Sequence, residues 1–227
     1  MVFFNKIWCN TLVSNTRRVG VAVFGLVFGL LALGALLREI VARSAQGSFD
    51  ALDFCSRFTH QSTLFAGIVL LACSYYAWHG KESTKLDWFH GAATLYMILT
   101  GVVYNLLLND ASPAFIWDDH IMHKVTPIVM FLSWFVVNRP SSRILYDGDW
   151  SASMWLVYPL GFAVYSQLYG RFIRPDDYLY SFLDSANGQG LHVAGMVALL
   201  TGACAIVALV MVKMPLRIVP STRRALV

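Results

Sequence analysis

Val19–Leu37, V-G-V-A-V-F-G-L-V-F-G-L-L-A-L-G-A-L-L, decides the class of fold, because it contains no charged side chain and no strongly polar one. In a helix with a rise of about 1.5 Å per residue, it crosses most of the roughly 30 Å apolar core of a bilayer. Arg17 and Arg18 precede it, as basic residues precede the apolar part of a signal peptide. Because about 19 residues exceed the roughly 7–15 usual in a signal peptide, we expect an uncleaved first membrane span.

Five further apolar segments of similar length follow, and we expect each to be a membrane-spanning helix. The six predicted spans cover about residues 19–37, 58–78, 88–108, 121–137, 150–169 and 191–212. The composition agrees, since 13% of the residues are charged, against roughly a quarter in soluble domains. The sequence therefore predicts an all-α polytopic membrane protein, in which residues 1–227 form one integral membrane domain with a bundle of six transmembrane helices.

The distribution of basic residues predicts how the spans are oriented. About 11 of the 17 Lys and Arg residues fall on the side that holds both termini, and about 6 fall on the other. The positive-inside rule then places both termini in the cytoplasm and the first, third and fifth loops outside. A bacterial cell would carry such a protein in its plasma (inner) membrane. The net charge of +4 belongs to loops and tails, so we expect no nucleic-acid partner.

Polar residues gather at the predicted outer ends of the spans. The densest cluster is W-D-D-H-I-M-H-K-V-T-P at Trp117–Pro127, which opens the fourth span with two acids and two histidines. Polar groups at the edge of a membrane span are costly to place there and usually indicate function. The candidate site residues at this level are Thr59, His60, Gln61, Ser62, Thr63, Asn105, Asp118, Asp119, His120, His123, Asp184 and His192.

One chemistry that this cluster could support is nucleophilic catalysis by a hydroxyl group and a histidine. A hydroxyl is a weak nucleophile at neutral pH and needs a base within hydrogen-bond reach, most often an imidazole. Thr59, Ser62 or Thr63 could supply the hydroxyl, and His123 the imidazole, if the second and fourth spans pack together. Asp119 or Asp184 could then orient the imidazole, as the acid of a catalytic triad does.

Two alternatives compete with this hypothesis. His60, His120, His123 and His192 are feasible metal ligands, and a catalytic zinc commonly takes three protein ligands and a water, so a metal-dependent lipid hydrolase is the first alternative. The order D-D-H-x-x-H matches no familiar zinc motif, and we expect no metal or other cofactor. The second alternative is a membrane protein that binds lipid without transforming it.

A few glycines and one proline predict local packing. Gly25 and Gly29 form a G-x-x-x-G pattern that permits close helix contact, and Gly101 and Gly195 are expected at close-packing positions as well. Pro127 lies one turn inside the fourth span and lacks a backbone N–H. It is therefore expected to loosen the start of that helix and to leave a carbonyl group free beside His123.

Five motifs together resemble, in this order, the androgen-induced membrane protein family and its bacterial relatives. They are F-T-H-Q-S-T (58–63), L-T-G-V-V-Y-N-L-L-L (99–108), H-I-M-H-K-V-T-P (120–127), W-L-V-Y-P-L (155–160) and Y-L-Y-S-F-L-D (178–184). Animal members of that family are intramembrane threonine hydrolases that cleave fatty acid esters of hydroxy fatty acids. The resemblance implies that Thr59 is the nucleophile and that His123, in an M-H step, is its partner.

The resemblance thus implies a lipid ester hydrolase whose partners are its ester substrate and the membrane lipids. Thr59 would attack the ester carbonyl, and His123 would act as general base and then acid. Gln61, Asn105 or backbone N–H groups at the start of the second span would stabilise the oxyanion. Supporting roles fall to Ser62, Asp119, His120 and Asp184, while Phe65, Phe131 and Leu132 are expected along the path of the acyl chain.

Overall fold

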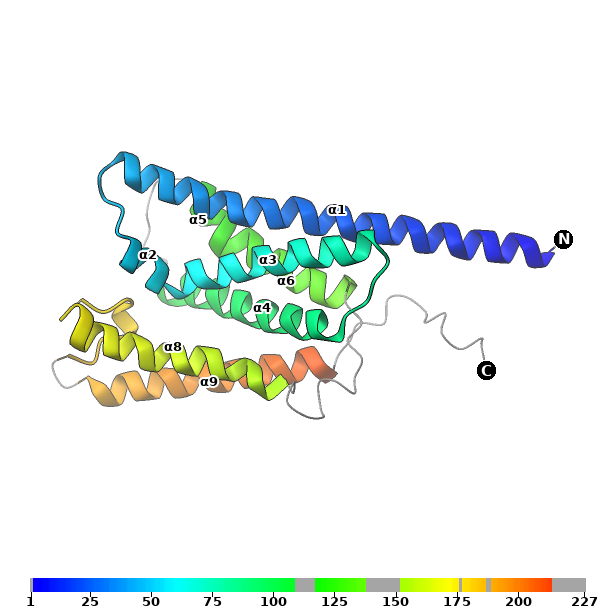
Figure 1. Cartoon of the computed structure of the whole chain (residues 1–227). Helices are drawn as coiled ribbons and strands as arrows, with labels where there is room; N and C mark the ends of the chain where they lie inside the picture. The colour runs from blue at the N-terminus through cyan, green and yellow to red at the C-terminus, as the bar shows by residue number, and fades with distance from the viewer. Residues whose placement is uncertain (1, 109–116, 138–151, 176, 187–188, 214–227) are drawn as a thin grey trace.

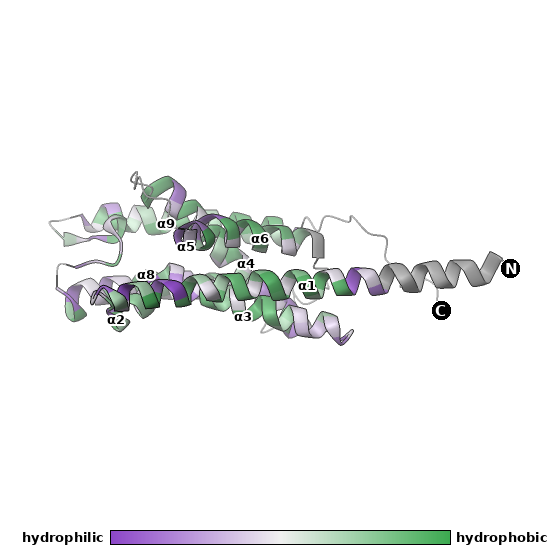
Figure 2. Ribbon diagram, turned by 90° about the horizontal axis from the view of Figure 1, so that it is seen from above, coloured by the Kyte–Doolittle hydropathy of each residue, from purple (hydrophilic) through white to green (hydrophobic). Residues whose placement is uncertain are grey.

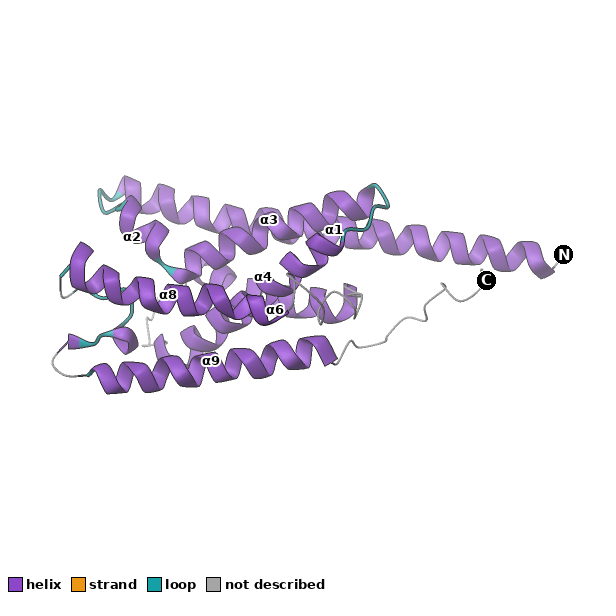
Figure 3. Cartoon of the chain, turned by 60° about the horizontal axis from the view of Figure 1, so that its bottom comes forward, coloured by secondary structure: helices purple, strands orange, loops and turns teal. Residues whose placement is uncertain are grey.

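The described residues of the computed structural model, 2–108, 117–137, 152–175, 177–186 and 189–213, are helical apart from short turns. No strand occurs among them (Figure 3). The predicted all-α class is therefore confirmed. Residues 109–116 and 138–151 lie outside the described ranges. They include most of the expected third loop, all of the expected fourth loop and the first two residues of the predicted fifth span.

The long helices run side by side along one direction (Figure 1). They are α1 (Val2–Ala45), α3 (Phe58–Trp78), α4 (Thr84–Val103) with its π-helical continuation η1 (Tyr104–Leu108), α8 (Val157–Leu168) and α9 (Gly190–Lys213). A further helix is composed of α5 (Trp117–His120), the π-turn η2 (Ile121–Val125), α6 (Thr126–Leu132) and the π-turn η3 (Ser133–Val137). The turns η4 (Ala152–Leu156) and η5 (Tyr169–Ile173) flank α8, and a single 3-10 turn, η6 (Ser181–Leu183), precedes α9.

Three helices within the described ranges are long and apolar enough to cross a membrane: Asn15–Ala45, Thr84–Leu108 and Gly190–Lys213. They coincide with the predicted first, third and sixth spans. The predicted second span is α3, whose first turns carry polar side chains. In the predicted fourth and fifth spans, the α-helix is interrupted by π-helical or 3-10 turns. Figure 2 shows apolar residues along the middle of the helices and hydrophilic ones toward their ends. Six crossings remain a prediction.

The first helix is longer than its apolar run. It continues to Ala45, so that part of the expected first loop, about 38–57, is helical, and a short helix α2 (Ala51–Ser56) occupies most of the rest. Asp50 begins α2 by accepting a hydrogen bond from the N–H of Asp53, at 3.0 Å. This extension carries Arg38, Glu39 and Arg43 down to the level of the start of α3.

Glycines set the distance between α1 and α3. A Cβ atom on Gly25 would lie 2.6 Å from the carbonyl oxygen of Leu70, and one on Gly29 would lie 2.9 Å from Leu71 Cγ. The two backbones are therefore closer than larger residues would allow, and the interpretation of G-x-x-x-G as a packing motif is confirmed. Gly195 has open space around it, so its predicted packing role is wrong.

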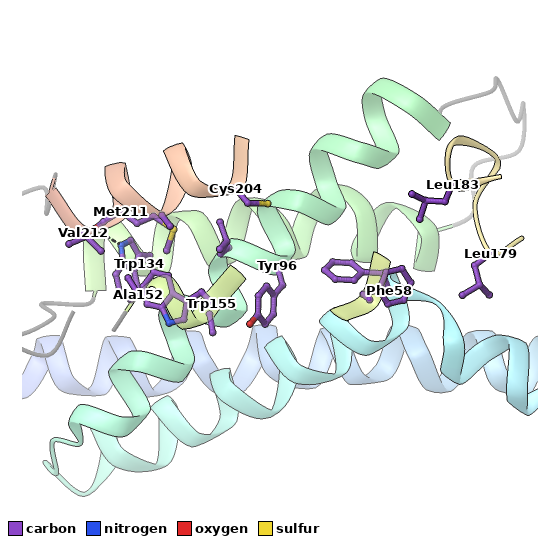
Figure 4. Close-up of a cluster of buried hydrophobic side chains, with 14 of the residues drawn as sticks. Phe58, Tyr96, Trp134, Ala152, Trp155, Leu179, Leu183, Cys204, Met211 and Val212 are labelled. Atoms are coloured by element: carbon purple, nitrogen blue, oxygen red, sulfur yellow. Dashed lines mark hydrogen bonds between the residues drawn. The ribbon is translucent and has the colours of Figure 1, made fainter. Parts of the chain in front are cut away.

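The largest buried cluster joins α4 to α8 and α9 (Figure 4). Trp134 and Trp155 are almost completely buried there and meet edge to face, with ring centroids 5.8 Å apart. Trp134 also donates a hydrogen bond to the carbonyl oxygen of Met211 on α9, at 3.2 Å. This packing lies at one end of the cluster, while Phe58, at the start of α3, lies toward the other end, next to the candidate site.

Candidate functional site

Thr59 and His123 lie within hydrogen-bond reach of each other, although 64 positions separate them in the sequence. Thr59 Oγ1 is 3.3 Å from His123 Nε2. The chain enters α3 from Arg57 in an extended conformation, which puts Thr59 in the first turn of the helix, and His123 lies on the π-turn η2. The helical parts α3 and η2 pack against each other, and this contact brings together the two residues that the sequence placed at the centre of the site.

Asp119 fixes which nitrogen of His123 carries the proton. His123 Nδ1 lies 3.0 Å from the carbonyl oxygen of Asp119 and 3.0 Å from its carboxylate Oδ1. Both atoms are acceptors, so Nδ1 must be the N–H donor. The lone pair of Nε2 then faces the hydroxyl of Thr59, which is the arrangement that a general base needs.

Tyr104, at the end of α4, holds both members of this histidine–carboxylate pair. Its hydroxyl donates to Asp119 Oδ2 at 2.5 Å, and its ring stacks on the imidazole of His123. Burial alone would raise the pKa of Asp119, but hydrogen bonds from His123 and Tyr104 and the charges of His123 and His120 lower it overall. Asp119 therefore stays ionised at neutral pH. Sequence reasoning assigned Tyr104 no role, although Tyr104 lies in the second of the five resembling motifs, residues 99–108.

Pro127 explains the local shape of the chain around His123. Because Pro127 has no N–H, the carbonyl of His123 loses its usual partner four residues on. The helix widens there into a π-turn, in which the N–H of Thr126 donates to the carbonyl of Ile121. Asn105 Nδ2 reaches the free carbonyl of His123 at 3.4 Å and donates to the carbonyl of Gly101 at 2.7 Å. Asn105 thus supports the backbone of His123.

The first turn of α3 offers backbone N–H groups at the site. The hydrogen bond from the N–H of Gln61 to Arg57 starts the helix, so the N–H groups of Phe58 and Thr59 have no partner within it. Tyr180, in the segment 177–186, lies against them. Burial raises the pKa of Tyr180, while hydrogen bonds with the Thr59 side chain and the N–H groups of Thr59 and Phe58 oppose the rise. The tyrosine keeps its proton at neutral pH and can donate it.

Several other residues of the predicted site have different partners. Ser62 is almost fully buried, donates to the carbonyl oxygen of Thr59 at 3.1 Å and lies 2.9 Å from the hydroxyl of Thr100. The side chain of Gln61 donates to the carbonyl of Cys55 and accepts from Tyr158. Both are thereby held in structural hydrogen bonds beside Thr59, and neither reaches His123.

The histidines proposed as metal ligands are not gathered by the fold. His60 contacts the carbonyl of Phe54 at 2.7 Å and the carboxylate of Glu39 at 3.1 Å, and His192 is exposed on α9. Across the described ranges, no three His, Cys, Asp or Glu side chains are close enough together to hold a metal ion. Asp184 accepts a hydrogen bond from the N–H of Ala186 in its own turn, at 2.7 Å.

Two cavities meet at Thr59, Tyr104, Leu108 and Tyr180, which line both of them. The first is apolar and runs between α4, α8 and α9. Its further lining includes Leu99, Val103, Leu160, Phe162, Phe182, Val197 and Leu200. The second is polar and lies between α1, η2 and the segment 177–186. Its further lining includes Arg38, Glu39, Arg43, Arg57, Asp118, Asp119, His120, His123 and Lys124.

The three residues expected along the path of an acyl chain, Phe65, Phe131 and Leu132, do not line the apolar cavity. Phe131 and Leu132 are 45% and 47% exposed on the outside of α6, and Phe65 packs against the core. The apolar cavity is instead lined by α8 and α9, whose place beside α4 depends on tertiary packing. No pattern in the sequence shows which spans are neighbours, and this is why these residues were missed.

Comparison with known proteins gives one distant relative. An "Uncharacterized protein MG452 homolog" from Mycoplasma pneumoniae (strain ATCC 29342 / M129 / Subtype 1) is 23% identical over 130 residues, 54% of this chain and 51% of that protein. The chain therefore spans about half the length of this relative. No protein-family profile and no solved structure matches the chain.

Proposed function

We propose that this protein is an intramembrane threonine hydrolase that cleaves a lipid ester. The observation that carries the proposal is the chain of contacts from Thr59 to His123 to Asp119, with His123 Nε2 turned toward the hydroxyl at 3.3 Å. A hydroxyl, an imidazole whose Nδ1 is held by two acceptors and a carboxylate beside that imidazole are the parts that acyl transfer requires. The family resemblance of the sequence motifs, which assigns the same two residues, supports it independently.

The reaction proceeds in two acyl-transfer steps. Thr59 Oγ1 attacks the ester carbonyl while His123 Nε2 takes its proton, giving a tetrahedral oxyanion. The intermediate collapses as the imidazolium protonates the departing alkoxide, which leaves as an alcohol and leaves the acyl group on Thr59. Water then attacks the acyl-threonine with His123 again as base, releasing the carboxylic acid and restoring the hydroxyl. Asp119 stabilises the imidazolium in each step.

The oxyanion would be stabilised at the start of α3. The N–H groups of Phe58 and Thr59 have no intrahelical partner and hydrogen-bond the hydroxyl oxygen of Tyr180, whose place an oxyanion would take. The positive end of the helix dipole favours negative charge there. The hydroxyl of Tyr180 lies at the same place and keeps its proton. Of the groups expected from the sequence, the backbone N–H groups therefore suit this role better than Gln61 or Asn105.

The two cavities suit the two halves of an ester. The apolar cavity between α4, α8 and α9 fits an acyl chain, and the polar cavity fits the alcohol part. Thr59 lines both, so an ester bond at their junction would present its carbonyl to the hydroxyl. By the resemblance, fatty acid esters of hydroxy fatty acids are the first substrates to test.

The membrane arrangement belongs to the same proposal: six spans, both termini cytoplasmic and the site toward the outer side. Each of the six helical segments exposes large apolar side chains, as lipid-facing helices do. Examples, one from each segment, are Leu30, Ile68, Val102, Ile128, Val164 and Ile206, all more than 45% exposed. A cytoplasm-active reporter fused to Val227 tests the orientation, and absence of signal would contradict it.

Covalent labelling tests the proposed chemistry directly. We expect a fluorophosphonate to label the purified protein, and labelling and ester hydrolysis to be lost in Thr59→Ala and in His123→Ala. Ser62→Ala is the matched control, because it removes a neighbouring hydroxyl that bonds the carbonyl of Thr59 and the hydroxyl of Thr100 and does not reach His123. Labelling that survives both changes would refute the assignment, and hydrolysis that is lost on chelation would favour the metal alternative.

A further inference from the structure

Among the described basic residues that line the polar cavity, one, Lys124, has no acidic partner. Four basic side chains line it, Arg38, Arg43, Arg57 and Lys124, together with three acids, Glu39, Asp118 and Asp119. Arg38 Nη1 lies 2.7 Å from both carboxylate oxygens of Asp118. Arg43 pairs with Glu39, and Arg57 makes two hydrogen bonds of 2.9 Å to Asp53, outside the cavity.

Lys124 differs from these arginines. It follows His123 directly on η2 and is partly buried. Within the part of the chain that the structure describes, it has no hydrogen-bond, ion-pair or ring partner. An ammonium group half withdrawn from water favours an anion more strongly than one in free solvent, since water screens it less. An anion that entered this cavity would meet Lys124 without breaking an existing ion pair.

We propose that Lys124 binds a carboxylate on the alcohol part of the ester and thereby selects substrates whose alcohol part carries a negative charge. This inference rests on the proposed function and names the residue that determines which esters the hydrolase prefers. The apolar cavity takes the acyl chain on one side of Thr59, so the alcohol part extends into the polar cavity, where Lys124 is available. A charged hydrogen bond of the substrate to an ammonium group is strong enough to set preference between otherwise equal substrates.

The test compares one ester in two forms, a fatty acid ester of a hydroxy fatty acid with its carboxylate free or as the methyl ester. We expect the wild type to prefer the free acid. In Lys124→Met, the ratio of kcat/KM for the acid to that for the methyl ester should fall roughly tenfold to a hundredfold. Lys124→Arg should restore most of the ratio. Lys81→Met is the matched control, because Lys81 lies over the ring of Tyr75 at the other end of α3. An unchanged ratio in Lys124→Met would overturn the inference.

A binding measurement separates this inference from the hydrolase itself. Oleate and methyl oleate are titrated against Thr59→Ala and against Thr59→Ala combined with Lys124→Met. We expect oleate to bind the first variant roughly ten times more tightly than the second, and methyl oleate to bind the two alike. Equal oleate affinity would contradict the role of Lys124 even if the protein hydrolyses esters. Lysine-dependent oleate binding in a protein without turnover would support anion binding and refute only the hydrolase.

Discussion

The ring of Tyr104 lies nearly parallel to the imidazole of His123, with centroids 3.7 Å apart and planes inclined by 16°. The hydroxyl of the same tyrosine donates a hydrogen bond to the carboxylate of Asp119, whose other oxygen contacts His123 Nδ1. One side chain from the end of α4 therefore restrains both the plane of the base and the position of its partner. A base held in this way has few orientations open to it other than the one that faces Thr59.

The two contacts of Tyr104 can be separated by substitution. Tyr104→Phe keeps the stacked ring and removes the hydrogen bond to Asp119, and we expect kcat to fall about tenfold. Tyr104→Leu removes both contacts and should lower kcat further, by about a hundredfold, because the imidazole is no longer held. Steady-state hydrolysis of one lipid ester measures both. If the two variants were equal in activity, the stacking would have no role in positioning His123.

Asp119→Asn should reduce activity by about a hundredfold or more, because the imidazolium loses its stabilising carboxylate. It should also change how stability depends on pH. The pKa of Asp119 lies below its ordinary value of 3.8 in the folded protein, so its contribution is fully present above about pH 4 and is lost as the pH falls through the folded pKa.

Unfolding of the wild type and of Asp119→Asn in detergent, followed from pH 7 to pH 3, measures this contribution. The advantage of the wild type should be constant near neutrality and should shrink only below about pH 4. A gap that did not change down to pH 3 would contradict a lowered pKa of Asp119 in the folded state.

Tyr180→Phe tests stabilisation of the oxyanion. Loss of one donor should lower kcat by roughly a hundredfold with a small change in KM, because the interaction forms only in the transition state. Tyr178→Phe is the matched control: Tyr178 also lines the polar cavity, but its hydroxyl lies 3.2 Å from Ser185 Oγ. Equal losses in the two variants would point to a general effect on the segment 177–186.

Gly101 and Gly195 form a matched pair for packing. A Cβ on Gly101 would lie 3.0 Å from Pro127 Cβ and 3.4 Å from the carbonyl oxygen of His123, whereas one on Gly195 meets open space. Gly101→Ala should destabilise the protein by about 1–3 kcal/mol and lower activity by shifting η2. Gly195→Ala should be neutral or stabilising by up to about 1 kcal/mol. Midpoints of denaturation give both values, and a reversed order would contradict the described α4–η2 contact.

The amino-acid sequence alone predicts the all-α class, the approximate positions of the long helices and the gathering of polar residues at one end of them. Val19–Leu37 and its counterparts are apolar over lengths that only helices can place in a membrane, and α3 begins and ends at the predicted residues 58 and 78. The hydroxyl of Thr59 and the imidazole of His123 were identified from chemistry and motif. Pro127 also predicted a free carbonyl group beside His123.

Only the tertiary structure decided which of these groups meet. A periodic apolar pattern shows that a helix is buried or faces lipid, but not which helix lies beside it, since many neighbours bury an apolar face equally well. The contact of α3 with η2 selected Thr59 over Ser62, the end of α4 brought Tyr104 onto His123, and α8 and α9 rather than Phe131 enclosed the apolar cavity. The pairing of Arg38, Arg43 and Arg57 with acids, which leaves Lys124 available, likewise depends on distances that exist only in the folded chain.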